Sequence, residues 1–548
     1  MILSNAIRNY ISLYGKKNDM RASARPVRAR LLLVPVLAGA LAVMAACSSQ
    51  AGSSASSTKP VRGGQLVVAI DAQPTGFDPA TADDPSPGAA SVSNEIFSTL
   101  TVPTASGTYA PYLAKSVQGN SDDSVWTITL RPGMEFADGT PINAAAIEYN
   151  LARIKATGAD YTQVKTFQVT SPLTLVITLN APWSAFPASL SGQPGWIASP
   201  AALKSEGKGF ATKPVGSGPY ELSSWSQGNQ IVLVPNPHFW RKGLPYLTKV
   251  TYKIITDSSA RLSALQAGNV DMAEVDPAQA AAQGINTSSQ YKTYDMANGI
   301  DLVYFNTGVA PLNNILARRA VAEATNRPAL ITSIWRGVGS VANSPMSSSN
   351  PFYTPVNFPG FNLQQAKQLV QQYQQATGKP LALTLSSSND PTQELEAQAL
   401  QSMWQAAGIK VTLAAPQEAG TYSETVIGKK YEAAIFGFPS ILDPDQWYTL
   451  IWTPQGVLNV ANYKNATIGT AIVQAAQATT VQGRRAQYAI VNNEIAQQVY
   501  SLFIHSSVNE IAARSNVQGL NTLTLPDGTK APFGQEFQVF SVETMWLG

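Results

Sequence analysis

Cysteine and histidine are almost absent from this chain: Cys47 is the only cysteine, and His238 and His505 are the only histidines among 548 residues. One cysteine excludes an internal disulfide, which suits an exported chain that avoids redox chemistry. A zinc or nickel site built from protein ligands needs clustered His or Cys, so we expect no metal and no other cofactor. A Ser-His-Asp hydrolase would have to use one of the two histidines, and no nucleophile-elbow motif accompanies them. We therefore expect a binding protein, not an enzyme, and interpret both histidines as structural.

Charge is also scarce, at 13% of residues, and the formal net charge of +3 is unevenly distributed. Seven of the 37 basic residues and one of the 34 acidic residues precede Cys47. The rest of the chain has 30 basic and 33 acidic residues, a net charge of −3. Binding to nucleic acid requires a concentrated basic surface, so we expect no nucleic-acid partner.

The chain has one long apolar run near its start, residues 31–46, preceded by four arginines between positions 21 and 30. Sixteen residues are short for a permanent membrane span, which needs about 20. The run ends in small residues followed by Cys47, an arrangement that resembles a bacterial lipobox. We predict a signal peptide over residues 1–46, a lipid on the Cys47 thiol, and attachment to the outer face of the cytoplasmic membrane. Residues 47–62 are rich in Ser and Gly and are expected to form a flexible tether.

The folded part shows strand patterns and helix patterns in alternation. Residues 65–70 are predicted to form a buried strand, and residues 125–130 alternate in polarity as a strand with one wet face does. Thr140 and Pro141 predict an N-cap and first position of a helix that extends to about residue 154. Such succession favours an α/β fold.

A second helix is predicted from Asp390 and Pro391, with apolar residues at spacing four at positions 395, 399 and 403 beside Leu400 and Trp404. Gly408 predicts its end, and residues 409–413 and 431–438 are predicted to be strands. These elements place alternating helices and strands in the second half of the chain.

Six blocks of sequence occur in order at residues 126–141, 215–220, 236–240, 260–271, 305–307 and 318–327. Together they resemble the family 5 bacterial extracellular solute-binding proteins, which serve ABC importers of peptides, nickel and oligosaccharides. The resemblance implies an α/β, two-lobed periplasmic-binding-protein-like fold (type II, cluster C) with an extra subdomain inserted in the first lobe. It also implies a monomer that hands a small solute, with peptide as the leading option, to an ABC permease in the membrane.

Transferred onto this chain, the resemblance implies three structural units after the tether. The first lobe would comprise residues 61–100, 196–300 and 500–548. The inserted subdomain would comprise residues 101–195, and the second lobe residues 301–499.

The resemblance also implies which residues contact the solute, on loops that face the gap between the lobes. Phe438 and Trp447 would be walls, and Asn306, Asp443 and Asp445 would hydrogen-bond the solute. Ser440 stands where peptide-binding relatives commonly carry an aspartate that holds the peptide's amino terminus. Asp443 or Asp445 could take the place of that aspartate. Otherwise the solute is a glycan or another compound without a free amine. A further alternative is that the protein acts as an envelope sensor or regulator and not in transport. The full set of candidate ligand-binding residues is Phe77, Asp78, Asn306, Phe438, Ser440, Asp443, Asp445 and Trp447.

Overall fold

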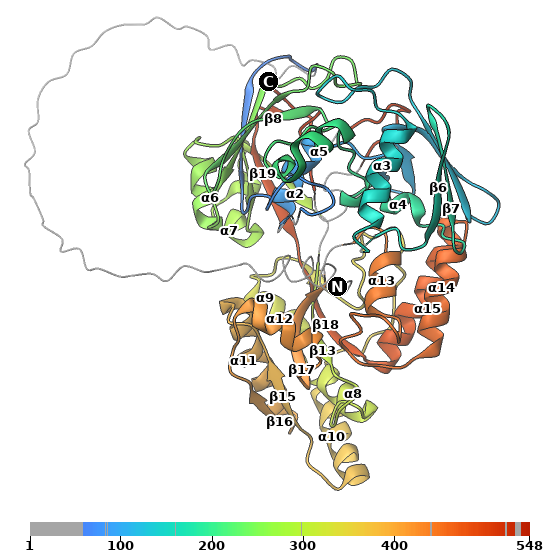
Figure 1. The fold of residues 1–548 in the computed structure, drawn as a ribbon. Coiled ribbons are helices and arrows are strands. Elements are labelled where there is room, and N and C mark those ends of the chain that lie inside the picture. Colours follow the sequence, from blue (N-terminus) through green and yellow to red (C-terminus); the bar gives the residue numbers. More distant parts are fainter. Residues whose placement is uncertain are drawn as a thin grey trace, which may run out of the picture.

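The computed structural model describes residues 59–82, 84, 86–158, 160–296, 299–438, 441–520, 523–531 and 539–548. Two sheets dominate these residues, one in each of two lobes stacked along the long axis of the molecule (Figure 1). The predicted signal peptide, Cys47 and Ser440 lie outside the described residues. Within the described part, no helix has the length and apolarity that crossing a membrane would require.

The first lobe is built on a seven-stranded sheet. β1 runs parallel to both of its neighbours, β10 and β11, and the other pairings are antiparallel. Helices cover both faces of this sheet, and each face has its own apolar core. In sheet order the strands are β12 (Tyr291–Met296), β19 (Asn509–Arg514), β11 (Met272–Val275), β1 (Gln65–Ile70), β10 (Lys249–Ile254), β9 (Gln230–Pro235) and β8 (Tyr220–Ser226). The helices are α2 (Pro87–Ile96), α5 (Pro200–Glu206), α6 (Ser258–Gln266) and α7 (Pro277–Ala282), with short 3-10 turns at Gly207–Ala211 and Ile285–Thr287.

An inserted subdomain interrupts the first lobe and has a core of its own. Its antiparallel sheet packs on one long helix, and the residues of β5 alternate between buried and half-buried, as the sequence predicts. The elements are β2 (Thr101–Pro103), β3 (Tyr109–Pro111), the sheet β4 (Ala114–Gly119), β5 (Val125–Leu130), β7 (Thr174–Leu179), β6 (Val164–Ser171), and the helices α3 (Ala144–Lys155), α4 (Phe186–Ser189) and Gln193–Gly195.

The predicted start of α3 is wrong by one turn. The helix begins at Ala144, and the side chain of Asn143 caps it by accepting the N–H of Ala146 at 2.9 Å. Thr140 does not cap because its N–H and hydroxyl both donate to Asp138. Pro141 instead pairs with Glu135 in a short bridge.

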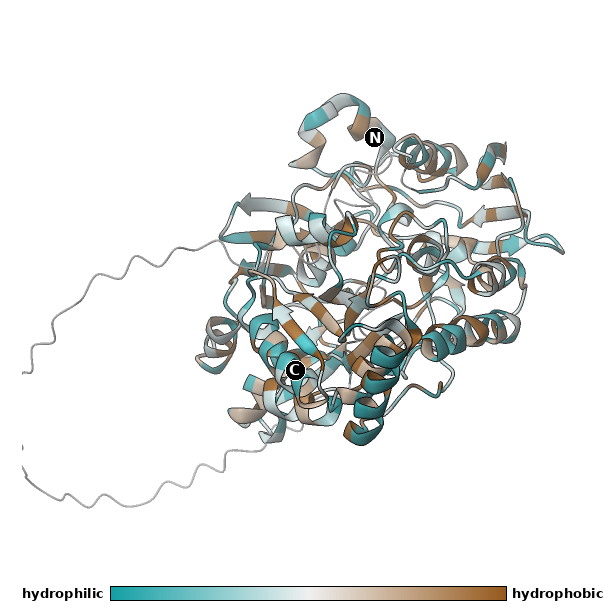
Figure 2. Ribbon diagram, turned by 90° about the horizontal axis from the view of Figure 1, so that it is seen from below, coloured by the Kyte–Doolittle hydropathy of each residue, from teal (hydrophilic) through white to brown (hydrophobic). Residues whose placement is uncertain are grey.

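The second lobe has one continuous core around a six-stranded sheet. Figure 2, which views the molecule from below, shows helices that carry both brown apolar and teal polar segments. In sheet order the strands are β14 (Ser340–Val341), β18 (Ser501–Ser506), β13 (Ile300–Phe305), β17 (Ala433–Phe438), β15 (Ala382–Ser386) and β16 (Lys410–Leu413). The helices are α8 (Ile315–Ala324), α9 (Arg327–Ile334), α10 (Leu363–Thr377), α11 (Pro391–Ala406), α12 (Ala419–Ile427), α13 (Asp445–Ile451), α14 (Ala466–Gln477) and α15 (Val481–Gln498).

The chain crosses between the sheets twice, from β12 to β13 and from β18 to β19. The N–H of Ser507 donates to the carbonyl of Gly299 at 3.0 Å and joins the two crossings. Strand β18, which the sequence analysis assigns to the first lobe, lies in the second sheet because it pairs with β13. The other limits of the units stay predictions.

Candidate functional site: the contact between the lobes

The loop that follows β17 lies at the end of the second lobe nearest the crossings. β17 runs antiparallel to β13, so Phe438 lies opposite Ile300, the first residue of β13 after the crossing from the first lobe. Phe438 is buried, and its ring lies 6.4 Å from those of both Trp447 and Trp452. The predicted residues Phe438, Asp443, Asp445 and Trp447 are therefore brought together on one loop and the start of α13.

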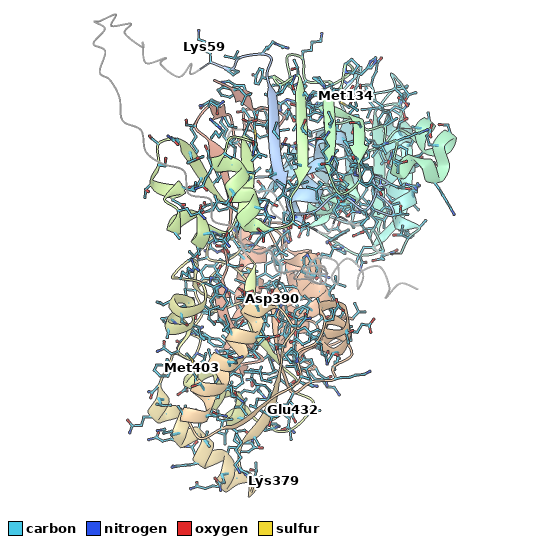
Figure 3. The ribbon with its side chains drawn as sticks, turned by 90° about the vertical axis from the view of Figure 1, so that its left-hand side faces the viewer. Lys59, Met134, Lys379, Asp390, Met403 and Glu432 are labelled. Atoms are coloured by element: carbon cyan, nitrogen blue, oxygen red, sulfur yellow. The ribbon has the colours of Figure 1, made fainter. Side chains whose placement is uncertain are left out.

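Asn306 lies at the opposite end of β13. Its N–H donates to the carbonyl of Glu432 at 2.9 Å, and Figure 3 shows Glu432 in the part of the second lobe remote from the first. Its side-chain amide donates to the carbonyls of Lys429 and Tyr431 and accepts the N–H of Gly308. The prediction that Asn306 faces the gap is wrong, because β13 carries the chain away from the crossing before reaching this residue.

Phe77 and Asp78 are buried within the first lobe and the adjoining subdomain. The ring of Phe77 packs edge-on against Trp225, with centroids 5.1 Å apart. Asp78 accepts two hydrogen bonds from the guanidinium of Arg153 on α3, one of them 2.6 Å long. Both side chains are engaged in holding the loop after β1, so their role as solute contacts stays a prediction.

Asp443 and Asp445 have different surroundings although only Pro444 separates them. Asp443 is 3% exposed, and both of its oxygens accept from Arg484 of α15. Burial alone would lower the pKa of Arg484, but the carboxylate of Asp443 raises it above its usual value. Both oxygens of Asp443 are engaged within the protein, while Nε of Arg484 is buried with no hydrogen-bond partner among the described residues. The role of Asp443 as a solute contact stays a prediction.

Asp445 is the first residue of α13, where the positive end of the helix dipole favours a carboxylate. Its Oδ2 accepts the indole N–H of Trp183 at 2.8 Å, while its Oδ1 is buried with no hydrogen-bond partner among the described residues. Burial raises the pKa of Asp445 to about 6; Arg484 opposes this rise and Asp443 adds to it.

The partner of Asp445 was not predicted from the sequence, because Trp183 belongs to the inserted subdomain and lies 262 positions away. Two further hydrogen bonds join the same units: the side-chain amide of Gln446 donates to Asp160 at 3.0 Å, and the N–H of Ser184 donates to the carbonyl of Ala476 at 2.8 Å. The only local signal was a tryptophan inside a turn that is otherwise short and polar, Asn-Ala-Pro-Trp-Ser.

Both histidines have structural partners. His505 is 2% exposed, with one ring nitrogen 2.9 Å from Asp301 and the other 2.9 Å from the carbonyl of Val338. His238 lies 2.7 Å from Glu135 on the surface. Among the residues that the structure describes, no group of three or more His, Cys, Asp or Glu side chains is placed to hold a metal ion.

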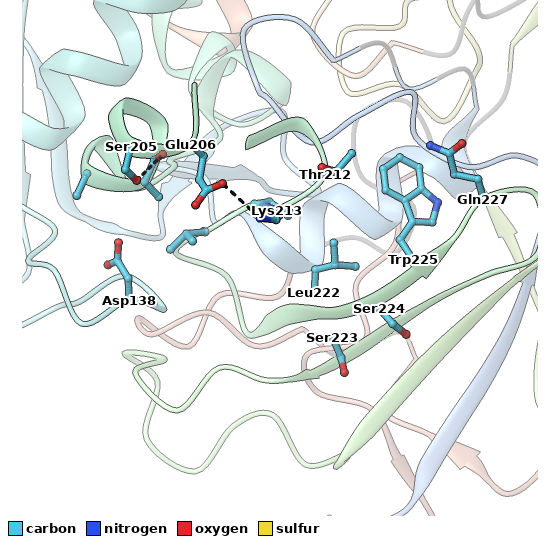
Figure 4. A pocket seen from close by; sticks show the side chains of 14 residues that line it. Asp138, Ser205, Glu206, Thr212, Lys213, Leu222, Ser223, Ser224, Trp225 and Gln227 are labelled. Atoms are coloured by element: carbon cyan, nitrogen blue, oxygen red, sulfur yellow. Dashed lines mark hydrogen bonds and ion pairs between the residues drawn. The ribbon is translucent and has the colours of Figure 1, made fainter. Parts of the chain in front are cut away.

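A cavity of about 810 Å³ opens elsewhere, against the first lobe (Figure 4). Its walls come from residues 138 and 201–227, and it includes the ion pair of Glu206 with Lys213 at 3.8 Å. Among the described residues, none of the second lobe lines it, so it is separate from the contact between the lobes.

The chain matches the family model "Bacterial extracellular solute-binding proteins, family 5 Middle" over residues 108–459. It is 29% identical to a probable D,D-dipeptide-binding periplasmic protein of Escherichia coli K12 over 426 residues, covering 74% of this chain and 81% of the relative.

Solved structures show the same two-lobed fold. The oligopeptide-binding protein AppA of Bacillus subtilis, solved with a nonapeptide, superposes with a TM-score of 0.71 at 23% identity, covering 89% of this chain and all of AppA. The murein tripeptide-binding protein MppA, solved in an unliganded open form, gives a TM-score of 0.73 at 22% identity, covering 89% of this chain and 99% of MppA. Proteins of this family bind peptides and other small solutes outside the cytoplasm, for ABC importers, and are not enzymes. The chain belongs to the family 5 bacterial extracellular solute-binding proteins.

Proposed function

We propose that this protein is a receptor, anchored by a lipid on Cys47, that encloses an oligopeptide-like solute between its lobes and delivers it to an ABC permease. The observation that carries the choice of solute is the buried Oδ1 of Asp445 beside the inserted subdomain; this oxygen has no hydrogen-bond partner in the described part of the chain. An unsatisfied buried carboxylate oxygen costs free energy, and a cationic hydrogen-bond donor offsets that cost. The amino terminus of a peptide is such a donor.

Asp445 is a better partner for an ammonium group than Asp443. Both oxygens of Asp443 already accept from Arg484, and a second cation would have to compete with that buried pair. Trp447, two positions after Asp445 and half-buried, supplies apolar surface for a side chain of the solute, and the fully buried Phe438 packs against its ring from within the lobe. Asp445 therefore takes the role that Ser440 cannot fill.

The test compares peptides with free and acetylated amino termini against the wild-type chain and the Asp445→Asn variant. Acetylation removes the positive charge, so it should weaken binding to wild type by roughly 10-fold or more and binding to Asp445→Asn much less. Isothermal titration calorimetry gives the four affinities. Equal losses in both proteins would show that Asp445 does not hold the amine.

The peptide itself can be identified by native mass spectrometry of the gently purified protein, followed by dissociation of the bound solute. Released solutes with the masses of peptides would support the proposal. A solute with the mass of a glycan would show that the protein binds a glycan instead, and would leave the receptor role in place. Deleting the cognate permease should abolish uptake; an unchanged phenotype would point to the sensor or regulator role.

The anchor has a separate test. Cys47→Ser should move the protein from the membrane fraction to the soluble fraction, and the wild-type chain purified with detergent should carry the mass of a diacylglycerol on its first residue. An unmodified Cys47 in membrane-purified protein would overturn the lipid anchor and leave solute binding untouched.

A further inference from the structure

Trp183 projects from a rigid base in the inserted subdomain. Its backbone N–H donates to the carbonyl of Asp123 at 3.1 Å, and its ring packs edge-on against Phe186 with centroids 5.6 Å apart. These contacts fix both the backbone and the plane of the indole within its own subdomain. The N–H at the edge of that indole reaches across to Asp445 of the second lobe.

The acceptor of this hydrogen bond, Asp445, is equally fixed in position. The N–H of Asp445 donates to Oδ1 of Asp443 at 3.0 Å, and Asp443 is held by Arg484. The acceptor for Trp183 thus belongs to a helix start that is anchored in the core of the second lobe. A hydrogen bond between two prepositioned groups loses little side-chain entropy when it forms.

Two neighbouring contacts use the same pair of surfaces. Ala476 lies in the last turn of α14, where carbonyls have no partner within the helix, and the N–H of Ser184 satisfies one of them. Gln446, next to Asp445, donates to Asp160. A fourth approach is steric: a Cβ added at Gly107 would lie 2.7 Å from Cβ of Pro351, so the turn between β2 and β3 touches the second lobe as well.

All of these atoms belong to the protein chain, and none of the contacts needs a solute. We propose that the hydrogen bonds from Trp183, Ser184 and Gln446 form a latch by which the inserted subdomain holds the second lobe closed even in the ligand-free protein. Solute binding then adds to a closed state that is already populated, and solute release requires the latch to break. This inference goes beyond solute capture and does not depend on which solute is bound.

The experiment measures lobe closure without any solute. The chain carries Cys47→Ser so that dyes attach only at Lys165→Cys on β6 and Gln474→Cys on α14, and it is unfolded, dialysed and refolded to remove bound solute. Single-molecule energy transfer then counts closed and open molecules. The parent should be largely closed, and Trp183→Phe, which keeps the ring but loses the donor, should lower the closed-to-open ratio about tenfold.

Trp225→Phe is the matched control. Its indole donates to Gln73 at 3.1 Å within the first lobe, so the same chemical change there should leave the ratio unaltered. Gln446→Met, at a more exposed position, should lower the ratio by about threefold. If the parent and Trp183→Phe had the same closed-to-open ratio, and circular dichroism showed that both are folded, the latch would be overturned. Because no solute is used, that result would not bear on the proposed receptor function.

Discussion

Two buried carboxylates, Asp443 in the second lobe and Glu95 in the first, are neutralised in different ways. In the second lobe, Asp443 is paired with the guanidinium of Arg484. In the first lobe, Glu95 of α2 is fully buried, and its Oε1 accepts the N–H of Val542 at 2.7 Å, with no cation in contact among the described residues. Burial raises the pKa of Glu95 to about 8, with Val542 opposing the rise and Glu543 adding to it. Asp443 is therefore neutralised by pairing and Glu95 by holding a proton. Both devices occur in each lobe, because buried Glu543 of the first lobe contacts Arg241 and burial raises the pKa of Glu396 in the second.

The largest expected effect comes from breaking the pair in the second lobe. Arg484→Met leaves Asp443 buried without a cation and should cost about 3–5 kcal/mol of the free energy of unfolding. Urea unfolding followed by circular dichroism measures it. The adjacent Arg485→Met is the control, because Arg485 is exposed and donates to the carbonyl of Tyr353, so its loss should cost under about 1 kcal/mol. Similar costs for the two variants would mean that Asp443 is neutralised in another way.

In the first lobe the comparison predicts a dependence on pH. The folded-state pKa of Glu95 lies above its unfolded value, so the folded protein keeps a proton that the unfolded chain releases. Stability from this group is fully present below about pH 4.5 and is lost as the pH rises toward 8, at up to about 1.4 kcal/mol per pH unit.

Glu95→Gln removes this titration and keeps an acceptor for Val542. Because burial raises the pKa of Glu274 to about 8 as well, the informative quantity is the difference between wild type and variant, not the slope of either. The two should have similar stability near pH 4.5, and the variant should gain relative to wild type up to pH 8. A difference that stays constant over this range would show that Glu95 does not carry the proton.

The smallest effect is expected where a pair is partly open to water. The side chain of Arg153 is 31% exposed, so solvent screens its pair with Asp78. Asp78→Asn should cost about 1–2 kcal/mol, measured by thermal unfolding. Glu206→Gln, which breaks the exposed pair with Lys213, should cost nearly nothing. If Asp78→Asn proved as costly as Arg484→Met, exposure would not explain the ranking.

Local sequence patterns predicted the elements whose causes are local. β1 and β5 have the predicted bounds, Asp390 caps α11 by accepting the N–H groups of Thr392 and Gln393, and Gly408 follows that helix in a left-handed conformation. The buried side of α11 was only partly predicted. Leu395 is 58% exposed while Leu400 and Trp404 are buried, because the neighbouring elements, not the spacing alone, select which face is covered.

The candidate site was harder to predict because its contacts join distant positions. Asp443 and Arg484 are 41 positions apart within the second lobe, and the contact of Asp445 with Trp183 depends on how the inserted subdomain packs against that lobe; no window of sequence contains either pairing. The error at Asn306 has the same origin. The resemblance located Asn306 along the chain, but only the direction of β13 shows that this residue lies at the end of the strand remote from the first lobe.

The strand order also has a consequence for how the protein is made. β19 lies between β12 and β11, and β18 lies between β14 and β13, yet both strands come from the last 50 residues of the chain. Neither sheet can be completed until β18 and β19 have been synthesised. More than 200 residues separate β12 from β19, its neighbour in the sheet. The exported chain must therefore stay protected from aggregation until its final segment emerges, and a truncation near position 500 would damage both lobes at once.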